Sequence, residues 1–269
     1  MDLAHLNDRG LLLVGCGSMG GALLRGWLTR GLAPHAVHVI DPHPPDWLDA
    51  RGVPVNGPMP ADPAVLVLAV KPQQMGGVLP DLAALGQGGT LVVSVAAGVT
   101  LAAYERAFPD APVVRAMPNI PAAIGQGVTA IVGNARAGAA EMDLAASLMV
   151  AVGRVVRLSD ESQMDAVTAV SGSGPGYVFH MIEALAAAGE AEGLPAALAL
   201  ELARATVAGA GAMAAADDED PARLRESVTS PGGTTAAGLV QLMDAETGLM
   251  PLMRRTVAAA AARGRELGE

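Results

Sequence analysis

The chain has 269 residues, of which 51% are hydrophobic, 16% charged and 2% aromatic, and its formal net charge is -10. This length provides core for one large domain or two smaller ones. The negative charge argues against nucleic acid or an anionic membrane as a partner. No apolar run reaches the roughly 20 residues of a membrane span, and the N-terminus lacks a secretory signal, so we expect a cytoplasmic protein. A single cysteine excludes an internal disulfide and a cysteine-based metal cluster, and we expect no metal.

The chain begins with alternating strand-like and helical segments. Continuous Val, Leu and Ile runs between helices predict a mostly parallel, doubly wound sheet of the α/β Rossmann class. The expected strands are 11–14, 37–40, 65–70, 90–95, 113–116, 128–132 and 154–158.

After residue 158 the pattern becomes helical and rich in Ala, Leu and Met. The expected helices are 160–170, 176–192, 196–216, 222–228, 234–243 and 251–267, with Ser159 or Asp160 capping the first. We therefore expect a dinucleotide-binding domain over 1–158 and an all-α substrate-binding and dimerisation domain over 159–269. These helices are too apolar to be solvated on every side, which predicts a homodimer or a higher oligomer built from dimers.

A glycine-rich segment connects the first expected strand to a helix. It contains Gly15, Gly17 and Gly20 in the spacing of a dinucleotide-binding loop. The first glycine permits the tight turn, the second lets the backbone approach the pyrophosphate, and the third lets helix and strand pack closely. Ser18 and Met19 follow at the start of the helix, where a phosphate would bind.

Asp41 follows the second expected strand. An acidic residue about 20 residues after the glycines accepts the ribose 2′-hydroxyl and favours NAD over NADP. Here the gap is longer and His43 could meet a phosphate, so the sequence favours NADH only slightly over NADPH. The alternative is that Asp41 merely starts the turn into Pro42.

Three later segments have residues suited to ligand binding. Lys71, the only lysine, follows the third expected strand at the edge where open α/β sheets bind ligands. Asn119 could offer its amide to a nicotinamide or form a structural turn. The segment 230–235 places hydroxyls and glycines before a helix, which suits an anion, although an ordinary helix cap would use the same residue types.

In chain order these segments resemble the pyrroline-5-carboxylate reductase family over nearly the whole chain. The matching segments are 15–20, 69–73, 94–99, 115–119, 125–127, 165–175 and 228–239. The last of them, Val228-Thr229-Ser230-Pro231-Gly232-Gly233-Thr234-Thr235-x-x-Gly238-Leu239, is the most specific.

The resemblance implies hydride transfer from NADPH or NADH to the C=N bond of 1-pyrroline-5-carboxylate, giving L-proline, the last step of proline biosynthesis. It implies that the cyclic imine carboxylate binds at Ser230, Gly232, Gly233, Thr234 and Thr235, with Ser171 and Ser173 lining the same pocket. It also implies that the Thr235 hydroxyl lies beside the ring nitrogen as the catalytic group. The cofactor-binding candidates are Gly15, Gly17, Ser18, Met19, Asp41, Asn56, Val70, Lys71, Pro72, Ala97, Gly98 and Asn119.

Some positions depart from the family pattern, which usually has Thr at Ile120, an acidic residue at Ala187 and Glu at Met243. The alternatives are a reductase of a related cyclic imine and a non-catalytic dinucleotide-binding regulator on the same fold. A β-hydroxyacid dehydrogenase would need a lysine in its helical domain, and none follows Lys71. Among the histidines, His180 is expected in the core, and His5, His35 and His38 at the surface.

Overall fold

The computed structural model describes the chain except residues 1–2, 4–5, 88, 217 and 269, so His5 lies outside the described residues. The chain forms two compact units, a sheet unit of residues 1–173 with 260–269 and a helical unit of residues 174–259. The units therefore divide later than the boundary expected after residue 158. Residues 158–173, which follow the last strand, belong to the sheet unit because they bond to it. Glu161 forms an ion pair with Arg115, and the Asn119 side chain donates to the Ser171 carbonyl.

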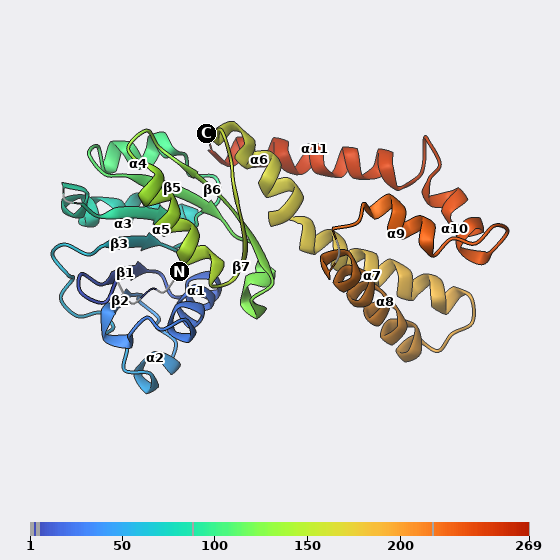
Figure 1. The fold of residues 1–269 in the computed structure, drawn as a ribbon, viewed down its shortest axis with the longest axis horizontal. Helices are drawn as coiled ribbons and strands as arrows, with labels where there is room; N and C mark the ends of the chain where they lie inside the picture. The colour runs from blue at the N-terminus through green and yellow to red at the C-terminus, as the bar shows by residue number, and fades with distance from the viewer. Residues whose placement is uncertain (1–2, 4–5, 88, 217, 269) are drawn as a thin grey trace. The chain divides into compact units, whose positions relative to one another are not determined.

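The first unit contains a seven-stranded sheet in the order β2-β1-β3-β4-β5-β6-β7 (Figure 1). Its strands are β1 Leu11–Val14, β2 Val37–Ile40, β3 Val65–Leu68, β4 Leu91–Ser94, β5 Val113–Met117, β6 Gly127–Gly133 and β7 Gly153–Arg157. All neighbours pair in parallel except β5 and β6. Only residues 118–126 separate these two strands, too few for the crossover that a parallel pair needs. The expected Rossmann class is confirmed.

Helices cover both faces of this sheet: α1 Ser18–Thr29, α2 Trp47–Ala50, α3 Met75–Leu82, α4 Leu101–Ala107 and α5 Ala139–Val150. The alternation of β1 explains the two cores, because successive side chains of a strand point to opposite faces. Leu11 and Leu13 pack with Trp27 of α1 in one core. Leu12 and Val14 pack with α3 and α4 in the other. A strand buried on both faces requires the uninterrupted apolar run seen in the sequence.

The segment after β7 forms three short turns instead of the single helix expected over 160–170. These are a 3-10 turn Glu161–Gln163, α6 Met164–Val167 and a π-helical turn Thr168–Gly172. Asp160 caps the first by accepting the Ser162 N–H at 2.7 Å, which confirms one of the two expected capping residues. Hydroxyls of Thr168 and Ser171 donate to carbonyls four residues earlier, a bond that bends helices.

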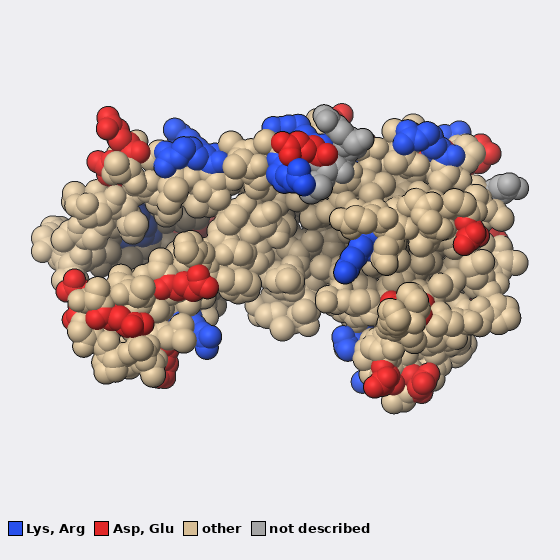
Figure 2. Space-filling model, turned by 180° about the vertical axis from the view of Figure 1, so that it is seen from behind, with Lys and Arg blue, Asp and Glu red and all other residues tan. Residues whose placement is uncertain are grey.

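The second unit consists of α7 Gly174–Ala191, α8 Ala196–Ala216, α9 Pro221–Ser227, α10 Thr234–Leu242 and the first part of α11 Leu249–Gly268. Small residues let α7 and α8 approach closely, since a Cβ on Gly189 would lie 3.4 Å from the Ala199 side chain. Many large apolar side chains of these helices remain exposed, including Phe179, Met181 and Leu202. On the face drawn in Figure 2, charged side chains form only small scattered groups.

Helix α8 is long and apolar enough to cross a membrane by length and composition alone, and it is the one such helix among the described residues. The helix carries Glu201 and Arg204, so it is not the uninterrupted apolar run that the sequence was expected to lack. Its apolar character arises from a run of alanines, whose packing against α7 buries Ala199 and Ala203.

Candidate functional site

The three loop glycines have different environments. Gly15 has φ +93°, and a Cβ there would lie 2.7 Å from the Ala69 carbonyl group. A Cβ on Gly20 would lie 2.1 Å from the Gly15 carbonyl oxygen. At Gly17 no atom lies within 4 Å of the Cβ position. The protein itself therefore requires glycine at two positions, while the space at Gly17 is free for a ligand to approach the backbone.

Helix α1 begins directly behind this free space. Its N-cap is Gly17, no side chain caps it, and its first internal bond runs from the Gly21 N–H to the Gly17 carbonyl at 2.8 Å. The N–H groups of Ser18 and Met19 therefore have no acceptor within the helix. Unpaired N–H groups at a helix N-terminus favour an anion such as a pyrophosphate. This loop fits a dinucleotide.

The strand register brings several candidate segments to one edge of the sheet. Val14 is paired with Ile40 and with Leu68, and Leu68 with Ser94. The segments that start at Gly15, Asp41, Ala69 and Val95 therefore leave the sheet at the same level. They carry the cofactor candidates Gly15, Gly17, Asp41, Val70, Lys71, Pro72, Ala97 and Gly98. The Lys71 side chain is exposed there and has no hydrogen bond or ion pair with any described residue.

Asp41 is fixed by main-chain donors on both sides. Its carboxylate accepts the Cys16 N–H at 2.6 Å and the His43 N–H at 2.8 Å. The second bond is the turn expected at Asp41-Pro42, and the first ties the residue to the glycine loop. Asn56 supports the Asp41 main chain, accepting its N–H at 3.0 Å and donating to its carbonyl at 2.8 Å. The charge thus has a fixed position at the end of β2.

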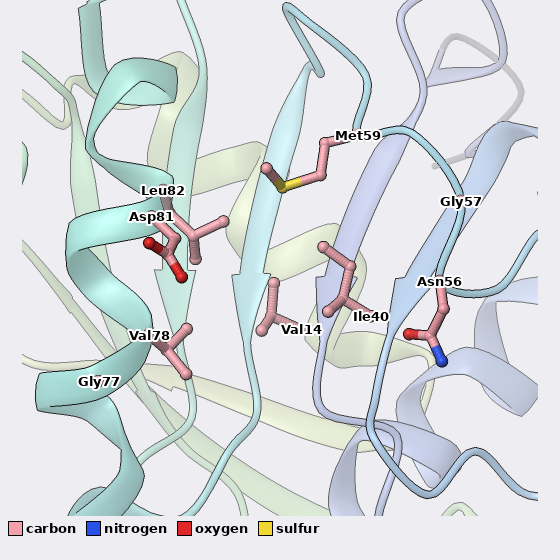
Figure 3. Close-up of a pocket in the computed structure, with 9 residues that line it drawn as sticks. All are labelled: Val14, Ile40, Asn56, Gly57, Met59, Gly77, Val78, Asp81 and Leu82. Carbon is pink, nitrogen blue, oxygen red and sulfur yellow. The ribbon is translucent and has the colours of Figure 1, made fainter.

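A pocket of about 330 Å³ opens beside this edge (Figure 3). Its lining residues are Val14, Ile40, Asn56, Gly57, Met59, Gly77, Val78, Asp81 and Leu82. Apolar side chains from strand ends and from α3 form most of its wall, as is usual for small-molecule sites. Sequence reasoning identified only Asn56 among these residues. The apolar spacing of Val78 and Leu82 was visible, but nothing in the sequence showed that this face of α3 would meet the end of β2.

Asn119 is engaged with the protein itself. Its amide donates to the Ser171 carbonyl at 3.1 Å and accepts the Val128 N–H at 2.9 Å. These bonds tie the π-helical turn to β6 and favour the structural alternative for this residue. The Ser171 hydroxyl donates to the Val167 carbonyl at 3.0 Å, and the Ser173 N–H donates to the Thr168 carbonyl. The neighbouring Ile120 is 62% exposed.

The segment Ser230 to Thr235 lies in the second unit, at the start of α10. Gly232 has φ +71°, and the Gly233 N–H closes the turn on the Ser230 carbonyl at 3.0 Å. No side chain caps α10, whose N-cap is Gly233. Thr234 and Thr235 are exposed, and neither hydroxyl has a hydrogen-bond partner in the described chain. This geometry favours an anion site over an ordinary side-chain cap.

The histidines differ from expectation in two places. The His180 side chain is 81% exposed, and its Nδ1 atom lies 3.0 Å from the Glu183 Oε2 atom. The expected core position was therefore wrong for the chain by itself. Its face of α7 is not covered within this unit. His35 is exposed, whereas His38 is partly buried with its Nε2 atom lacking a partner. Within the described part of the chain, no group of three His, Cys, Asp or Glu residues could hold a metal.

Two family models match the chain. The model for pyrroline-5-carboxylate reductase dimerisation matches residues 161–267. The model for NADP oxidoreductase, coenzyme F420-dependent, matches residues 11–98. The first match includes α7 to α10, and the second includes the glycine loop and the pocket residues.

Relatives of known name match over nearly the full length. Pyrroline-5-carboxylate reductase from Synechocystis sp. is 42% identical over 96% of this chain and 97% of its own length. The enzyme of that name from Pseudomonas aeruginosa is 38% identical over 96% of this chain and 97% of its own length. A pyrroline-5-carboxylate reductase structure from Coxiella burnetii superimposes with TM-score 0.91 at 34% identity, covering 98% of this chain and 100% of the other. A Plasmodium falciparum pyrroline carboxylate reductase with NADP bound gives TM-score 0.83 at 26% identity, covering 98% and 100%. With this fold, this glycine loop and this coverage, the chain belongs to the pyrroline-5-carboxylate reductase family.

Proposed function

We propose that this protein reduces 1-pyrroline-5-carboxylate to L-proline with a nicotinamide dinucleotide as the hydride donor. The observation that carries the proposal is the uncapped N-terminus of α10 with its two unpartnered threonine hydroxyls. It lies in the segment that most specifically matches the family. The named relatives, all pyrroline-5-carboxylate reductases, support the same reaction.

The dinucleotide supplies the hydride, and the chain supplies binding and orientation. Gly17, Ser18 and Met19 hold the pyrophosphate on main-chain N–H groups at the start of α1. The start of α10, from Gly233 to Thr235, holds the substrate carboxylate in the same way. The Thr235 hydroxyl orients the ring nitrogen of the imine, and Ser171 and Ser173 line the substrate pocket. Ser230 and Gly232 shape the turn that presents these groups.

For the cofactor, we propose a slight preference for NADH over NADPH. The Asp41 carboxylate is fixed at the end of β2 by the Cys16 and His43 N–H groups. A fixed negative charge there accepts a ribose hydroxyl and repels a 2′-phosphate. Val70, Lys71, Pro72, Ala97 and Gly98 complete the cofactor edge, and Asn56 holds Asp41 in place.

We propose that the protein works as a homodimer, or as a higher oligomer built from dimers, in the cytoplasm. Its helical unit exposes Phe179, Met181 and Leu185 in the isolated chain, and it matches a dimerisation family model. A partner copy would bury such apolar faces. Light scattering of the purified protein at micromolar concentration tests this, and a stable, active monomer would contradict it.

The decisive assay mixes purified protein with 1-pyrroline-5-carboxylate and either NADH or NADPH, and follows cofactor oxidation. A parallel series with the six-membered cyclic imine carboxylate measures ring-size preference. We expect turnover of the five-membered imine. Dinucleotide binding with no turnover of either imine would instead indicate a regulator on this fold, and a preference for the larger ring would indicate a related imine reductase.

A further inference from the structure

The pocket beside β2 has only two polar side chains in its lining, Asn56 and Asp81. It adjoins the glycine loop, because Val14 lines it and directly precedes Gly15. It also adjoins the fixed Asp41, through Asn56. A dinucleotide with its pyrophosphate at α1 and its ribose at Asp41 therefore places its base in this pocket. Its volume of about 330 Å³ lies at the small end of the usual range for ligand sites.

Asn56 is not free to recognise that base. Its Oδ1 atom accepts the Asp41 N–H and its Nδ2 atom donates to the Asp41 carbonyl. These two bonds hold the amide against the main chain of Asp41, as a neighbouring strand would be held, and both of its polar atoms are in use. The remaining walls of the pocket that come from side chains are apolar.

Asp81 is the other polar side chain, and it is available. It is exposed, and the structure gives its carboxylate no hydrogen bond or ion pair with any residue it describes. It follows Val78 by three residues in α3, a spacing that places the two side chains on one face of the helix, and it directly precedes Leu82. Figure 3 shows the Asp81 carboxylate between these two side chains, on the side of α3 toward the strand ends.

We propose that Asp81 determines base specificity by accepting a hydrogen bond from the exocyclic amino group of the cofactor's adenine. The inference rests on the proposed dinucleotide function and extends it to a residue outside the glycine loop. An ionised carboxylate only accepts hydrogen bonds, and the adenine amino group only donates. Val78 and Leu82 on one side and Ile40 and Met59 on the other provide the apolar surfaces for the faces of the base.

The matched probe is the hypoxanthine analogue of NADH, in which a carbonyl oxygen replaces the amino group. This oxygen would face the carboxylate as a second acceptor, and the N1–H that the analogue gains lies on the neighbouring ring atom. Hydrogen bonds to charged groups are worth enough to expect about a tenfold lower kcat/KM for the analogue with the unaltered protein. The comparison leaves the pyrophosphate, ribose and nicotinamide contacts unchanged.

Two substitutions separate recognition from a structural role. Asp81→Ala should lower kcat/KM for NADH by about tenfold and leave the analogue nearly unaffected, so that their ratio approaches one. Asp81→Asn should also bring the ratio near one, but by improving the analogue, because a carboxamide donates as well as accepts. A structural defect would lower kcat/KM for NADH and for the analogue by the same factor. As a control, Asp110→Ala also removes a carboxylate, but at the end of the sheet where β5 begins, away from the pocket. It should leave the ratio unchanged.

Binding of NADH and its analogue, followed by fluorescence titration without imine, distinguishes this inference from the proposed reaction. A binding preference that vanishes in Asp81→Ala, without imine turnover, would support the role of Asp81 and contradict the reaction. Equal affinity of the unaltered protein for the two dinucleotides would overturn the role of Asp81, and so would a preference that persists in Asp81→Ala. Either result is independent of whether proline is formed.

Discussion

The carboxylate of Glu161 forms an ion pair with the guanidinium of Arg115 in the sheet unit. The same oxygen accepts the Leu101 N–H at 2.7 Å, at the first residue of α4. The Arg115 side chain is only 9% exposed. Glu161 therefore neutralises a buried cation and also satisfies a free N–H group at the start of a helix.

We expect Glu161→Ala to lower the free energy of unfolding by about 3 kcal/mol, since it leaves a buried charge unpaired. Urea denaturation followed by circular dichroism measures this. The control is Asp143→Ala, which breaks an ion pair with Arg157. The side chains of this pair are largely in solvent, with Asp143 53% and Arg157 49% exposed. Exposed pairs contribute about 1 kcal/mol or less. Equal losses in the two variants would show that burial of Arg115 is unimportant.

Substitutions in the glycine loop should separate binding from folding. Gly17→Val should abolish dinucleotide binding with little loss of stability, because its Cβ position meets no protein atom. Gly20→Ala should lower stability as well, because its Cβ would lie 2.1 Å from the Gly15 carbonyl oxygen. Thermal unfolding and NAD(P)H fluorescence titration give the two readouts. Unchanged affinity in Gly17→Val would refute the loop as the pyrophosphate site.

Asp41→Ser should shift the ratio of kcat/KM values towards NADPH, because it removes the charge that repels a 2′-phosphate. The serine is shorter than aspartate, so the variant also loses the bond to the Cys16 N–H. Asp41→Asn keeps the shape and removes the charge, while its amide nitrogen replaces one of the two oxygens that accept the Cys16 and His43 N–H groups. It should move the ratio in the same direction. If neither variant changes the ratio, Asp41 serves only the turn and the loop.

Thr235→Val should lower kcat/KM for the imine by roughly ten- to a hundredfold, because losing a hydrogen bond to a buried polar group costs about 1–3 kcal/mol. Dinucleotide affinity should be unchanged, and steady-state kinetics with titration separate the two effects. Gly233→Ala should harm more, since its Cβ would lie 2.4 Å from the Ser230 hydroxyl and distort the turn. Wild-type kinetics in both variants would make the segment an ordinary helix start.

Cys16 should resist alkylation in the folded protein. Burial, and then the nearby Asp41 charge, raise the pKa of its thiol to about 11, although Arg25 opposes this. The folded state therefore holds the proton more tightly than the unfolded chain, and this contribution to stability is lost as pH rises from 9 towards 11. Iodoacetamide labelling at pH 8, followed by mass spectrometry, should modify the chain in urea far faster than the native protein. Similar rates would show an accessible, ionisable thiol.

The sequence by itself determined the elements of the sheet unit and the glycine-rich turn before α1. Strand β1 needs an uninterrupted apolar run because both of its faces are buried, so its pattern was sufficient to identify it. The roles of Gly15 and Gly20 follow from local turn geometry, which the spacing encodes. The segment 160–170 was predicted less well, because competing hydroxyl bonds from Thr168 and Ser171 are decided by small differences in local geometry.

Only the tertiary structure decided which distant residues meet. Asp81 and Ile40 line one pocket although β3 and the first part of α3 lie between them in the sequence. Their meeting at this pocket depends on the order β2-β1-β3, which places the end of β2 near α3. Glu161 and Arg115 are likewise joined by the path of the chain after β7. Periodicity records which side of an element is buried, but it carries no information about the neighbour that buries it. Long-range pairing is set by packing of the whole sheet unit, and the pocket and the ion pair exist only after that packing.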